Sequence, residues 1–494
     1  MTTLAIIIVY LVIVLLVGSL SSRLSRGTGE DYFVASRSIG PFFLLMSLFG
    51  TNMTAFAILG GSGEGYHKGI GVFALMPSIS ALVIPVVFFF IGTRVWALGK
   101  KHGYYTQIQF FRDRWNSNFL GLLLFVVSIT LLIPYLLIGV MGGGITLHNI
   151  TDKAVPEWVG AALVTGVVFA YVCFGGMRGT AWANAFQTVV FMILGGATLS
   201  IIVHKMGGLS GAIAKVQATH PELLQRGPAE VGGRNLISPV RMLTYTCIPL
   251  SVGMFPHMFM HWLTATKAAA FKKPLMFYPL CIAAVWIPSV LLGIFGAAEF
   301  EGLRGPQANY VLISMIREHA PVALAGLLCA GVFAAIMSSL DSQALSLGSM
   351  FTHDIVRHYG FQDRMTEKQQ IVYGRIFVFA ILALTFVLAQ VTNRSIFRLG
   401  IWCFTGFAAM FPVVLAALFW RRSTKVGAIS SVVSVIALWT FFFAKTWVNP
   451  AYKVMGTDVM PVVVILGVSA VAMVVGSLAS RPPEAATVSK FFRD

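Results

Sequence analysis

Hydrophobic positions in this chain gather into thirteen apolar segments, each near or above the ~20 residues that a helix needs to cross a bilayer. The segments are 3–21, 39–62, 69–97, 117–144, 156–175, 180–204, 240–264, 275–298, 321–350, 374–393, 395–420, 425–446 and 459–480. Short polar stretches separate them, and no stretch is long enough for a separate soluble domain. The pattern predicts an all-α polytopic membrane protein with about 13 transmembrane helices.

Composition supports this prediction. The chain of 494 residues is 57% hydrophobic and only 11% charged, whereas a soluble protein carries about 25% charged residues. The five cysteines all lie inside apolar segments, which is typical of small buried side chains and not of a disulfide framework. The net charge of +17 does not indicate nucleic acid, because no basic run is interleaved with aromatics. We expect one transmembrane domain over 1–480, followed by a cytoplasmic tail at 481–494.

The distribution of Lys and Arg predicts the orientation. An odd number of spans places the two termini on opposite sides of the membrane. Most of the 35 Lys and Arg then share one side, which holds loops 22–38, 98–116 and 265–273 and the C-terminal tail. Since cytoplasmic loops are enriched in these residues, we expect the N-terminus outside and the C-terminus inside. The first segment lacks a basic leader region and is too long for a signal peptide, so we expect it to be retained.

Two segments contain breaks at matching places. The second segment has Gly50, Thr51 and Asn52 at its centre, and the seventh has Pro249, Gly253 and Pro256. Secondary transporters often carry such broken helices in two inverted repeats, with substrates bound at the breaks. We therefore predict a five-plus-five inverted repeat, with its halves at 39–204 and 240–420. One extra helix at 3–21 precedes them, and two more at 425–480 follow.

Polar residues also form a stripe in the segment 321–350, which ends in MSSLDSQALSLGSM. At about 100° per residue, its five serines fall within an arc of roughly 100° that also holds Ala335. This stripe has two readings. Small residues let helices pack closely, or serine hydroxyls, together with backbone carbonyls freed by an unwound helix, coordinate a cation. Asp341 lies outside the arc, and charged residues at membrane depth often mark a functional site.

Four motifs show that the chain resembles the sodium:solute symporter family over about residues 5–480. AAIMSSLDSQ at 334–343 resembles the eighth core helix of that family, and FGTNM at 49–53 resembles the first. YVCFGGMRGTAWANAFQ at 171–187 resembles the Gly-Gly signature, and FPHMFMHWLTA at 255–265 resembles the sixth core helix. The resemblance implies the leucine-transporter fold and a co-transported sodium ion. It relates the chain to carriers of sugars, proline, pantothenate and monocarboxylates.

The resemblance also implies a sodium site. Its ligands would be the carbonyls of Gly50, Met53 and Ala335 and the hydroxyls of Ser338 and Ser339. The chain departs from the family in the fifth core helix, where Ala183-Asn184 replaces the usual Thr-Asp. Asn184 and Asp341 are therefore expected near the ion, with Asp341 either supplying the missing charge or serving as a buried hydrogen-bond acceptor.

For the solute, we expect a site at mid-membrane between the two broken helices. The candidate residues are Asn52, Thr54, Phe56, Tyr135, Phe255, His257 and Trp402. His257 and His261 stand four residues apart, but no third metal ligand is near them in the sequence, so a zinc site is disfavoured. We predict a sodium-coupled symporter of the inner cell membrane that takes up a small organic solute.

The alternatives are a proton-coupled carrier or uniporter of the same fold, and a solute sensor without transport. Without a catalytic set of residues, we do not expect an enzyme. We also expect no nucleic acid and no obligate protein partner.

Overall fold

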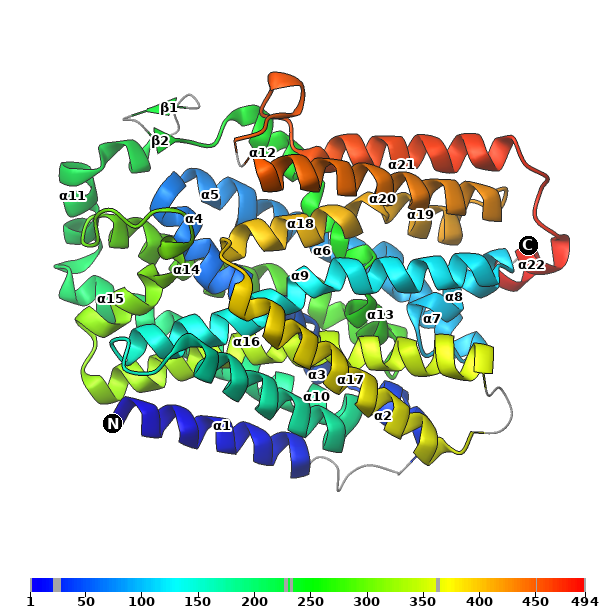
Figure 1. The fold of residues 1–494 in the computed structure, drawn as a ribbon, viewed down its shortest axis with the longest axis horizontal. Coiled ribbons are helices and arrows are strands. Elements are labelled where there is room, and N and C mark those ends of the chain that lie inside the picture. Colours follow the sequence, from blue (N-terminus) through cyan, green and yellow to red (C-terminus); the bar gives the residue numbers. More distant parts are fainter. Residues whose placement is uncertain are drawn as a thin grey trace.

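The computed structural model describes residues 2–20, 28–225, 230–231, 234–360, 365–449 and 451–492. Residues 22–27 of the predicted loop 22–38 and the last two residues of the tail lie outside this part. Long helices run side by side along the longest axis of the molecule (Figure 1). The start of α1 (Thr2–Leu20) and the C-terminal helix α22 (Ala485–Phe491) lie at opposite ends of that axis. Which end faces the cytoplasm stays a prediction.

Most long helices coincide with predicted segments. They are α1, α9 (Asn118–Ile150), α10 (Glu157–Lys205), α14 (Lys272–Ala297), α16 (Val322–Met350), α17 (Glu367–Val391), α20 (Lys425–Val448) and α21 (Pro461–Leu478). The segment 69–97 becomes α5 (Gly71–Phe73), α6 (Ile79–Val87) and α7 (Thr93–His102), which π-helical turns join into one span. The segment 395–420 becomes α18 (Ile396–Ala409) and α19 (Phe411–Phe419).

Both predicted breaks are present. The second segment consists of α3 (Pro41–Asn52) and, after Met53, a π-helical turn at Phe56–Gly60 that leads into α4 (Gly61–Lys68). The two parts are bent by 57°. The seventh segment consists of α12 (Pro239–Tyr245), a 3-10 turn at Ile248–Gly253 and α13 (Pro256–Leu263). Pro256 stands at the first position of α13, where its missing N–H costs no helical hydrogen bond.

The segments 156–175 and 180–204 are joined in an unexpected way. They form the single 49-residue element α10, which contains one non-helical residue, Gly176, at φ 53° and ψ −150°. Before Gly176, α10 packs along α9, where Gly160 faces Gly143. After it, Asn184 contacts Ser342 and Leu194 faces Gly331, so the chain runs back along α16. One glycine therefore makes the reversal for which we predicted a short loop at 176–179.

Shorter elements complete the fold. They are α2 (Gly29–Val34), α8 (Gln107–Trp115), α11 (Gly208–Thr219), α15 (Val311–His319), and the two-stranded antiparallel β1 (Glu230–Val231) and β2 (Arg234–Asn235). Among the described residues, ten helices are long and apolar enough to span a membrane, or eleven with the bent pair α3–α4. This count treats α10 as one span and leaves out the broken region 239–263. The predicted number of 13 spans is therefore not established.

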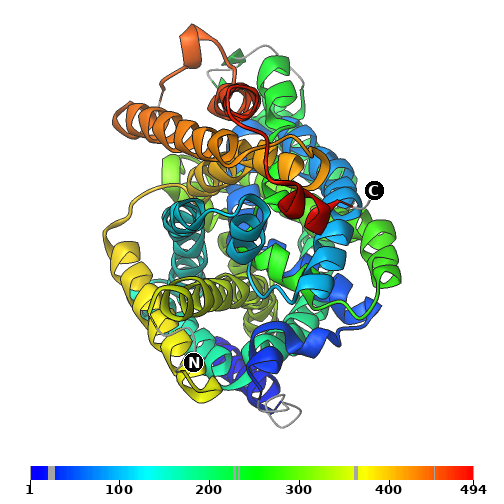
Figure 2. The ribbon, with the colours of Figure 1, turned by 90° about the vertical axis from the view of Figure 1, so that its right-hand side faces the viewer.

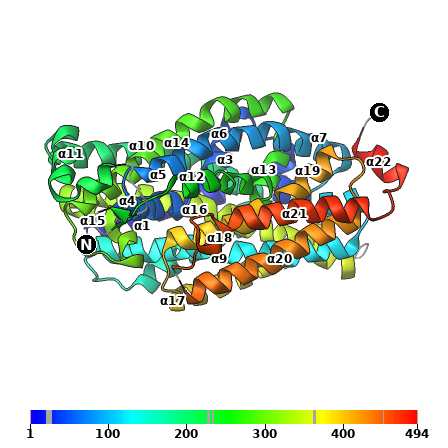
Figure 3. The ribbon, with the colours of Figure 1, turned by 90° about the horizontal axis from the view of Figure 1, so that it is seen from above.

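Helix α16 forms the centre of the core. Every residue from Leu328 to Met350 is buried, and the helix packs against α1, α3, α9, α10, α13 and α17. Helices α20 and α21 pair with each other on one flank of the bundle, as seen end-on in Figure 2 and from above in Figure 3. They reach the rest of the molecule mainly through α18 and α19. The serine stripe of α16 therefore lies deep in the protein, in contact with the broken helices.

Candidate functional site

The end of α3 places backbone carbonyls next to the serine stripe. The helix ends at Asn52, and the next residue, Met53, has an extended backbone at φ −90° and ψ 111°. Extended backbone at this point interrupts the i→i−4 hydrogen bonding of a helix, so carbonyl groups near the break are available to other partners. Gly50 lies one turn before the break, and a Cβ there would stand only 2.3 Å from Thr188 Oγ1 of α10. Glycine thus permits the close contact between α3 and α10.

Three of the five predicted sodium ligands meet at this point. The Ser338 hydroxyl lies 2.9 Å from the carbonyl oxygen of Gly50 and 3.1 Å from that of Ala335, within hydrogen-bond distance of both. The Ser339 hydroxyl donates to the carbonyl of Ile336 in its own helix, at 3.0 Å. Ser338 and Ser339 are fully or almost fully buried. This arrangement gathers neutral oxygen atoms in a dry region between α3 and α16, which suits a small hard cation.

Ser342, one turn further along α16, is the centre of a second polar cluster. Its hydroxyl donates to Asp341 Oδ1 at 2.9 Å and accepts from Asn184 Nδ2 at 2.9 Å. His261 Nε2 of α13 lies 3.1 Å from the same hydroxyl. Tyr171 donates to the other oxygen of Asp341, at 2.8 Å. Asn184 and Asp341 are therefore connected through one serine, and all five side chains are buried.

Sequence reasoning missed three members of this cluster. The sequence placed Ser342 in the serine stripe without a partner, it brought in His261 only with a disfavoured zinc site, and it gave Tyr171 no role. Their partners lie 81 to 170 residues away in the sequence, so no local pattern shows these contacts. The only signal was the position of Ser342 within the serine stripe, beside Asp341.

A small cavity of about 30 Å³ lies beside the two breaks. Asn52 and Phe56 line it from one broken helix, and Phe255 lines it from the other, together with Trp286 and Phe404. The Asn52 amide donates to the Tyr278 hydroxyl at 2.8 Å, and the Trp286 indole N–H donates to the sulfur of Met53 at 2.8 Å. The lining therefore combines aromatic walls with one amide, the kinds of side chain that bind small organic molecules, around a space about the size of one water molecule.

Tyr135 and His257 form an aromatic cluster next to this cavity. The Tyr135 ring lies 5.5 Å from Phe255, 5.8 Å from His257 and 5.0 Å from Phe404, as measured between ring centroids. Both side chains are fully or almost fully buried. Neither the Tyr135 hydroxyl nor the His257 ring nitrogens have a hydrogen-bond partner within the described residues. Buried polar groups rarely stay unpaired, so these atoms are candidates for contact with water or solute.

Thr54 and Trp402 stand apart from these contacts. The Thr54 hydroxyl accepts the backbone N–H of Phe56, at 2.9 Å, and so supports the turn after the break. Trp402 lies on α18, where its ring packs against Trp439 and Phe443 of α20. It lines a larger cavity of about 610 Å³ at the end of the molecule predicted to face outside. A role for Trp402 at the solute site stays a prediction.

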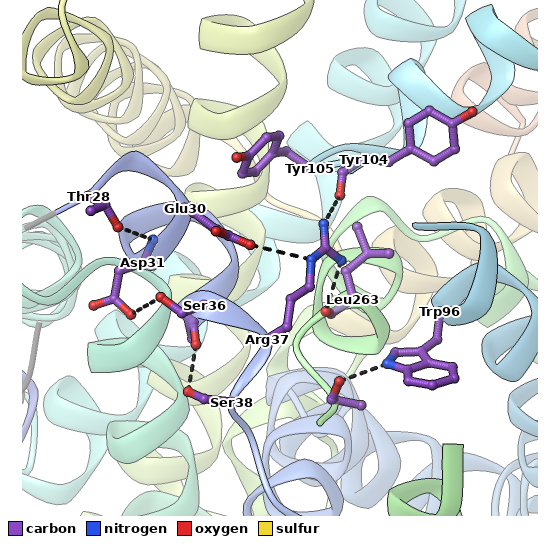
Figure 4. Close-up of polar contacts among 12 residues, drawn as sticks. Thr28, Glu30, Asp31, Ser36, Arg37, Ser38, Trp96, Tyr104, Tyr105 and Leu263 are labelled. Atoms are coloured by element: carbon purple, nitrogen blue, oxygen red, sulfur yellow. Dashed lines mark hydrogen bonds and ion pairs between the residues drawn. The ribbon is translucent and has the colours of Figure 1, made fainter. Parts of the chain in front are cut away.

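At the other end of the molecule, polar contacts around α2 join several segments of the chain (Figure 4). Asp31 accepts hydrogen bonds from Arg178 at 2.5 Å and from Ser36 at 2.8 Å. Arg37 donates to the carbonyls of Tyr104, at 2.9 Å, and Leu263, at 3.3 Å. These contacts connect the segment before α3 to α10, to the loop before α8 and to the end of α13. The larger cavity thus lies at one end, and the contacts around α2 lie at the other.

Comparison with known proteins identifies the group to which the chain is similar. Its sequence is 24% identical to the high-affinity proline transporter PutP of Bacillus subtilis (strain 168), over 83% of this chain and 86% of that protein. It is 26% identical to the sodium/pantothenate symporter of Escherichia coli (strain K12), over 86% of this chain and 87% of that protein.

The fold is similar to that of a Na⁺-coupled sialic acid symporter in a substrate-bound outward-open state. The TM-score is 0.80, with 17% sequence identity, over 98% of this chain and 99% of that one. This likeness agrees with the leucine-transporter fold expected from the motifs. The sequence profile of the sodium:solute symporter family matches residues 32–434. The chain therefore belongs to the sodium:solute symporter family, a family of transporters and not of enzymes.

Proposed function

We propose that this protein imports a small organic solute across the cell membrane by coupling it to the downhill entry of sodium. The observation that carries the proposal is the meeting of Ser338, Gly50 and Ala335 beside the break after α3. These residues supply one hydroxyl and two carbonyl oxygens, and the carbonyl of Met53, whose backbone is extended, is the further ligand that we propose. The related proteins PutP and the pantothenate symporter are named for small organic solutes, which supports the same class of cargo here.

Coupling would follow from the shared break. Residues 50–53 border the proposed ion site, while Asn52 and Phe56 line the small cavity beside it. An ion that draws the Gly50 carbonyl and Ser338 together also fixes the position of Asn52. Because linkage is reciprocal, a solute that binds at Asn52 must then increase the affinity for the ion. Alternating access would move the broken helices as a unit relative to α16 and α9.

A proton-coupled carrier is the second candidate, favoured by Asp341. This carboxyl group is fully buried in α16, and no Lys or Arg within the described residues forms an ion pair with it. Buried carboxyl groups in transporters often carry protons. In this mechanism, Asp341 would take up a proton from outside and release it inside, and Ser338 would serve only to hold α16 against α3.

Uptake by purified protein in liposomes would distinguish the two candidates. The solutes are labelled pyruvate, pantothenate, proline and glucose, which represent carboxylates, a zwitterion and an uncharged sugar. We expect an inward sodium gradient to drive accumulation of at least one solute at constant pH. We expect an inward proton gradient without sodium to drive none. Accumulation that needs only the proton gradient would overturn sodium coupling and support the role of Asp341 as a proton carrier.

A further inference from the structure

The cavity of about 610 Å³ at the predicted outer end is rich in cationic side chains. We call it the outer vestibule. Five Lys and Arg residues among those described line it: Lys68, Arg241, Arg394, Arg398 and Lys453. Of the residues that the structure describes, two acidic ones, Glu64 and Asp458, line the same space, and Asp458 pairs with Lys453 at 3.0 Å. The lining therefore carries a formal excess of three positive charges, from 5 basic minus 2 acidic residues.

These cations come from distant parts of the chain. Lys68 ends α4, Arg241 lies in α12, Arg394 and Arg398 flank the start of α18, and Lys453 follows α20. Some are fixed in place: the Arg394 guanidinium lies 4.1 Å from the ring centre of Trp447. The five cations therefore do not gather merely because they are neighbours in one loop. Their gathering also opposes the general trend, since Lys and Arg are normally depleted on the outer side of a membrane protein.

The outer vestibule adjoins the small cavity at the breaks. Phe397 lines the vestibule, and its ring stacks on Phe56 with centroids 5.0 Å apart. Phe56 in turn lines the small cavity and lies 4.8 Å from Phe404. A thin aromatic layer therefore separates the two spaces. A solute that enters from the outer vestibule meets the cationic lining first and the Phe56–Phe397 pair next.

We propose that the outer vestibule attracts and first binds the transported solute, and that this solute is a small organic carboxylate. The proposal rests on the proposed function, because it assigns the solute class to the same transport path. A cleft lined by one sign of charge between low-dielectric walls concentrates ions of the opposite sign and accelerates their binding. Arginine suits carboxylates in particular, since its planar guanidinium binds both oxygens. The positive charge of this lining would not increase the binding of an uncharged sugar, and it would increase the binding of a zwitterion only a little.

The test compares charge variants in the liposome assay. Arg241→Gln combined with Arg398→Gln removes two cations from the outer vestibule but leaves the breaks and α16 intact. We expect the KM for pyruvate or pantothenate to rise about tenfold, with kcat and the sodium dependence unchanged. Arg241→Lys with Arg398→Lys keeps the charge and should stay close to wild type, which separates charge from folding. Lys215→Gln on α11, an exposed cation outside the vestibule, is the matched control.

Ionic strength gives an independent readout. For the wild-type protein, the KM for the carboxylate should rise when choline chloride replaces sucrose, because salt screens the charges of the outer vestibule. In the Gln double variant, the KM should depend much less on ionic strength. Sodium-driven uptake of proline or glucose alone, with carboxylates ignored, would overturn this inference while leaving the proposed function intact. An unchanged KM in the Gln double variant would also overturn it.

If sodium drives no solute at all, the proposed function fails, and binding decides the vestibule question. Pyruvate at low ionic strength should then raise the Tm of wild type but not that of the Gln double variant. Equal shifts in both proteins, or none in either, would refute a carboxylate-binding vestibule.

Discussion

Ser338 connects the buried helix α16 to the broken helix α3. Its hydroxyl is the only side-chain group within the described residues that bonds the carbonyl of Gly50. The neighbouring Ser339 instead donates its hydrogen bond to the carbonyl of Ile336, within its own helix. Because a hydroxyl oxygen keeps lone pairs while it donates a hydrogen bond, both serines can still coordinate a cation. Their geometry nevertheless predicts unequal contributions.

We expect the double change Ser338→Ala and Ser339→Ala to abolish sodium-stimulated uptake while the protein stays folded. Loss of one oxygen ligand to a buried charge costs about 2 kcal/mol, or ~30-fold in sodium affinity. Ser338→Ala alone should be the more harmful single change, since only Ser338 contacts the break after α3. The readout is the sodium concentration for half-maximal uptake. Ser346→Ala, which removes a hydroxyl bonded within its own helix, serves as the control. Wild-type sodium dependence in the double variant would rule out the proposed sodium site.

Asn184 and Asp341 require a paired experiment, because Ser342 bridges them. If Asp341 supplies the charge that Asn184 lacks, Asn184→Asp should change little in the wild-type background but should restore sodium coupling lost in Asp341→Asn. At an assumed ~7 Å and an effective dielectric constant of about 20, the attraction of one carboxylate for sodium is roughly 2 kcal/mol before desolvation. Desolvation would reduce the gain to several-fold in affinity.

The measurement is sodium-dependent uptake by Asn184→Asp, Asp341→Asn and the double variant. The structure makes the test sharper, because an aspartate at 184 would share Ser342 with Asp341 and repel it. No change in sodium dependence in either background would mean that position 184 has no influence on the ion.

Residue-level prediction from the sequence succeeded where the chain carries a local signal. The helical periodicity of α16 correctly placed Ala335 and Ser338 on one face, and the glycine and polar residues at 50–52 indicated the break. The bonds of Ser342 to Asn184 and His261 were not predictable, because each joins helices far apart in the chain. The position of Trp402 also depended on how α18 is rotated, which one sequence does not determine.

At the scale of elements, α10 is the least expected feature. Two apolar segments separated by a few polar residues predicted two helices and a loop, but the chain reverses at Gly176 alone. Its backbone, at φ 53° and ψ −150°, lies in a region that is essentially restricted to glycine. A Cβ there would stand 2.6 Å from Cδ2 and 2.7 Å from the carbonyl oxygen of Tyr32. Hydrophobicity defines the two segments but does not show how tightly they connect.

Gly176→Ala should therefore destabilise the protein strongly. Backbone strain alone costs about 1–3 kcal/mol, and the contact with the Tyr32 carbonyl adds to it. We expect a lower Tm in detergent and reduced yield from membranes. Gly166→Ala is the matched control, since Gly166 lies in the helical part of the same element with open space around its Cα. That change should leave the Tm unchanged or raise it slightly. Equal Tm values for the two variants would show that the reversal does not need glycine.

On the scale of the whole molecule, the two ends differ in how they are held. The predicted outer end contains the outer vestibule of about 610 Å³. At the opposite end, Asp31 and Arg178 form an ion pair at 2.5 Å, with side-chain exposures of 0% and 15%, and Arg37 ties the same segment to α13. The proposed alternating access would require these contacts to break when the predicted inner end opens. The buried ion pair should therefore bias the protein toward the state with an open outer end.

Asp31→Asn and Arg178→Gln should each shift the equilibrium toward the inward-open state. Breaking one partner of a buried pair costs about 3–5 kcal/mol, and this cost falls mainly on the state in which the inner end is closed. A cysteine reporter at Ser395, which lines the outer vestibule, measures the effect as the rate of maleimide labelling from outside. We expect slower labelling in both variants.

Asp152→Asn, which removes an exposed ion pair with Arg317 at the opposite end, is the control and should label like wild type. In the double variant, the effect should fall short of the sum of the single changes, because both remove the same contact. Faster labelling in either single variant would mean that the pair stabilises the inward-open state instead.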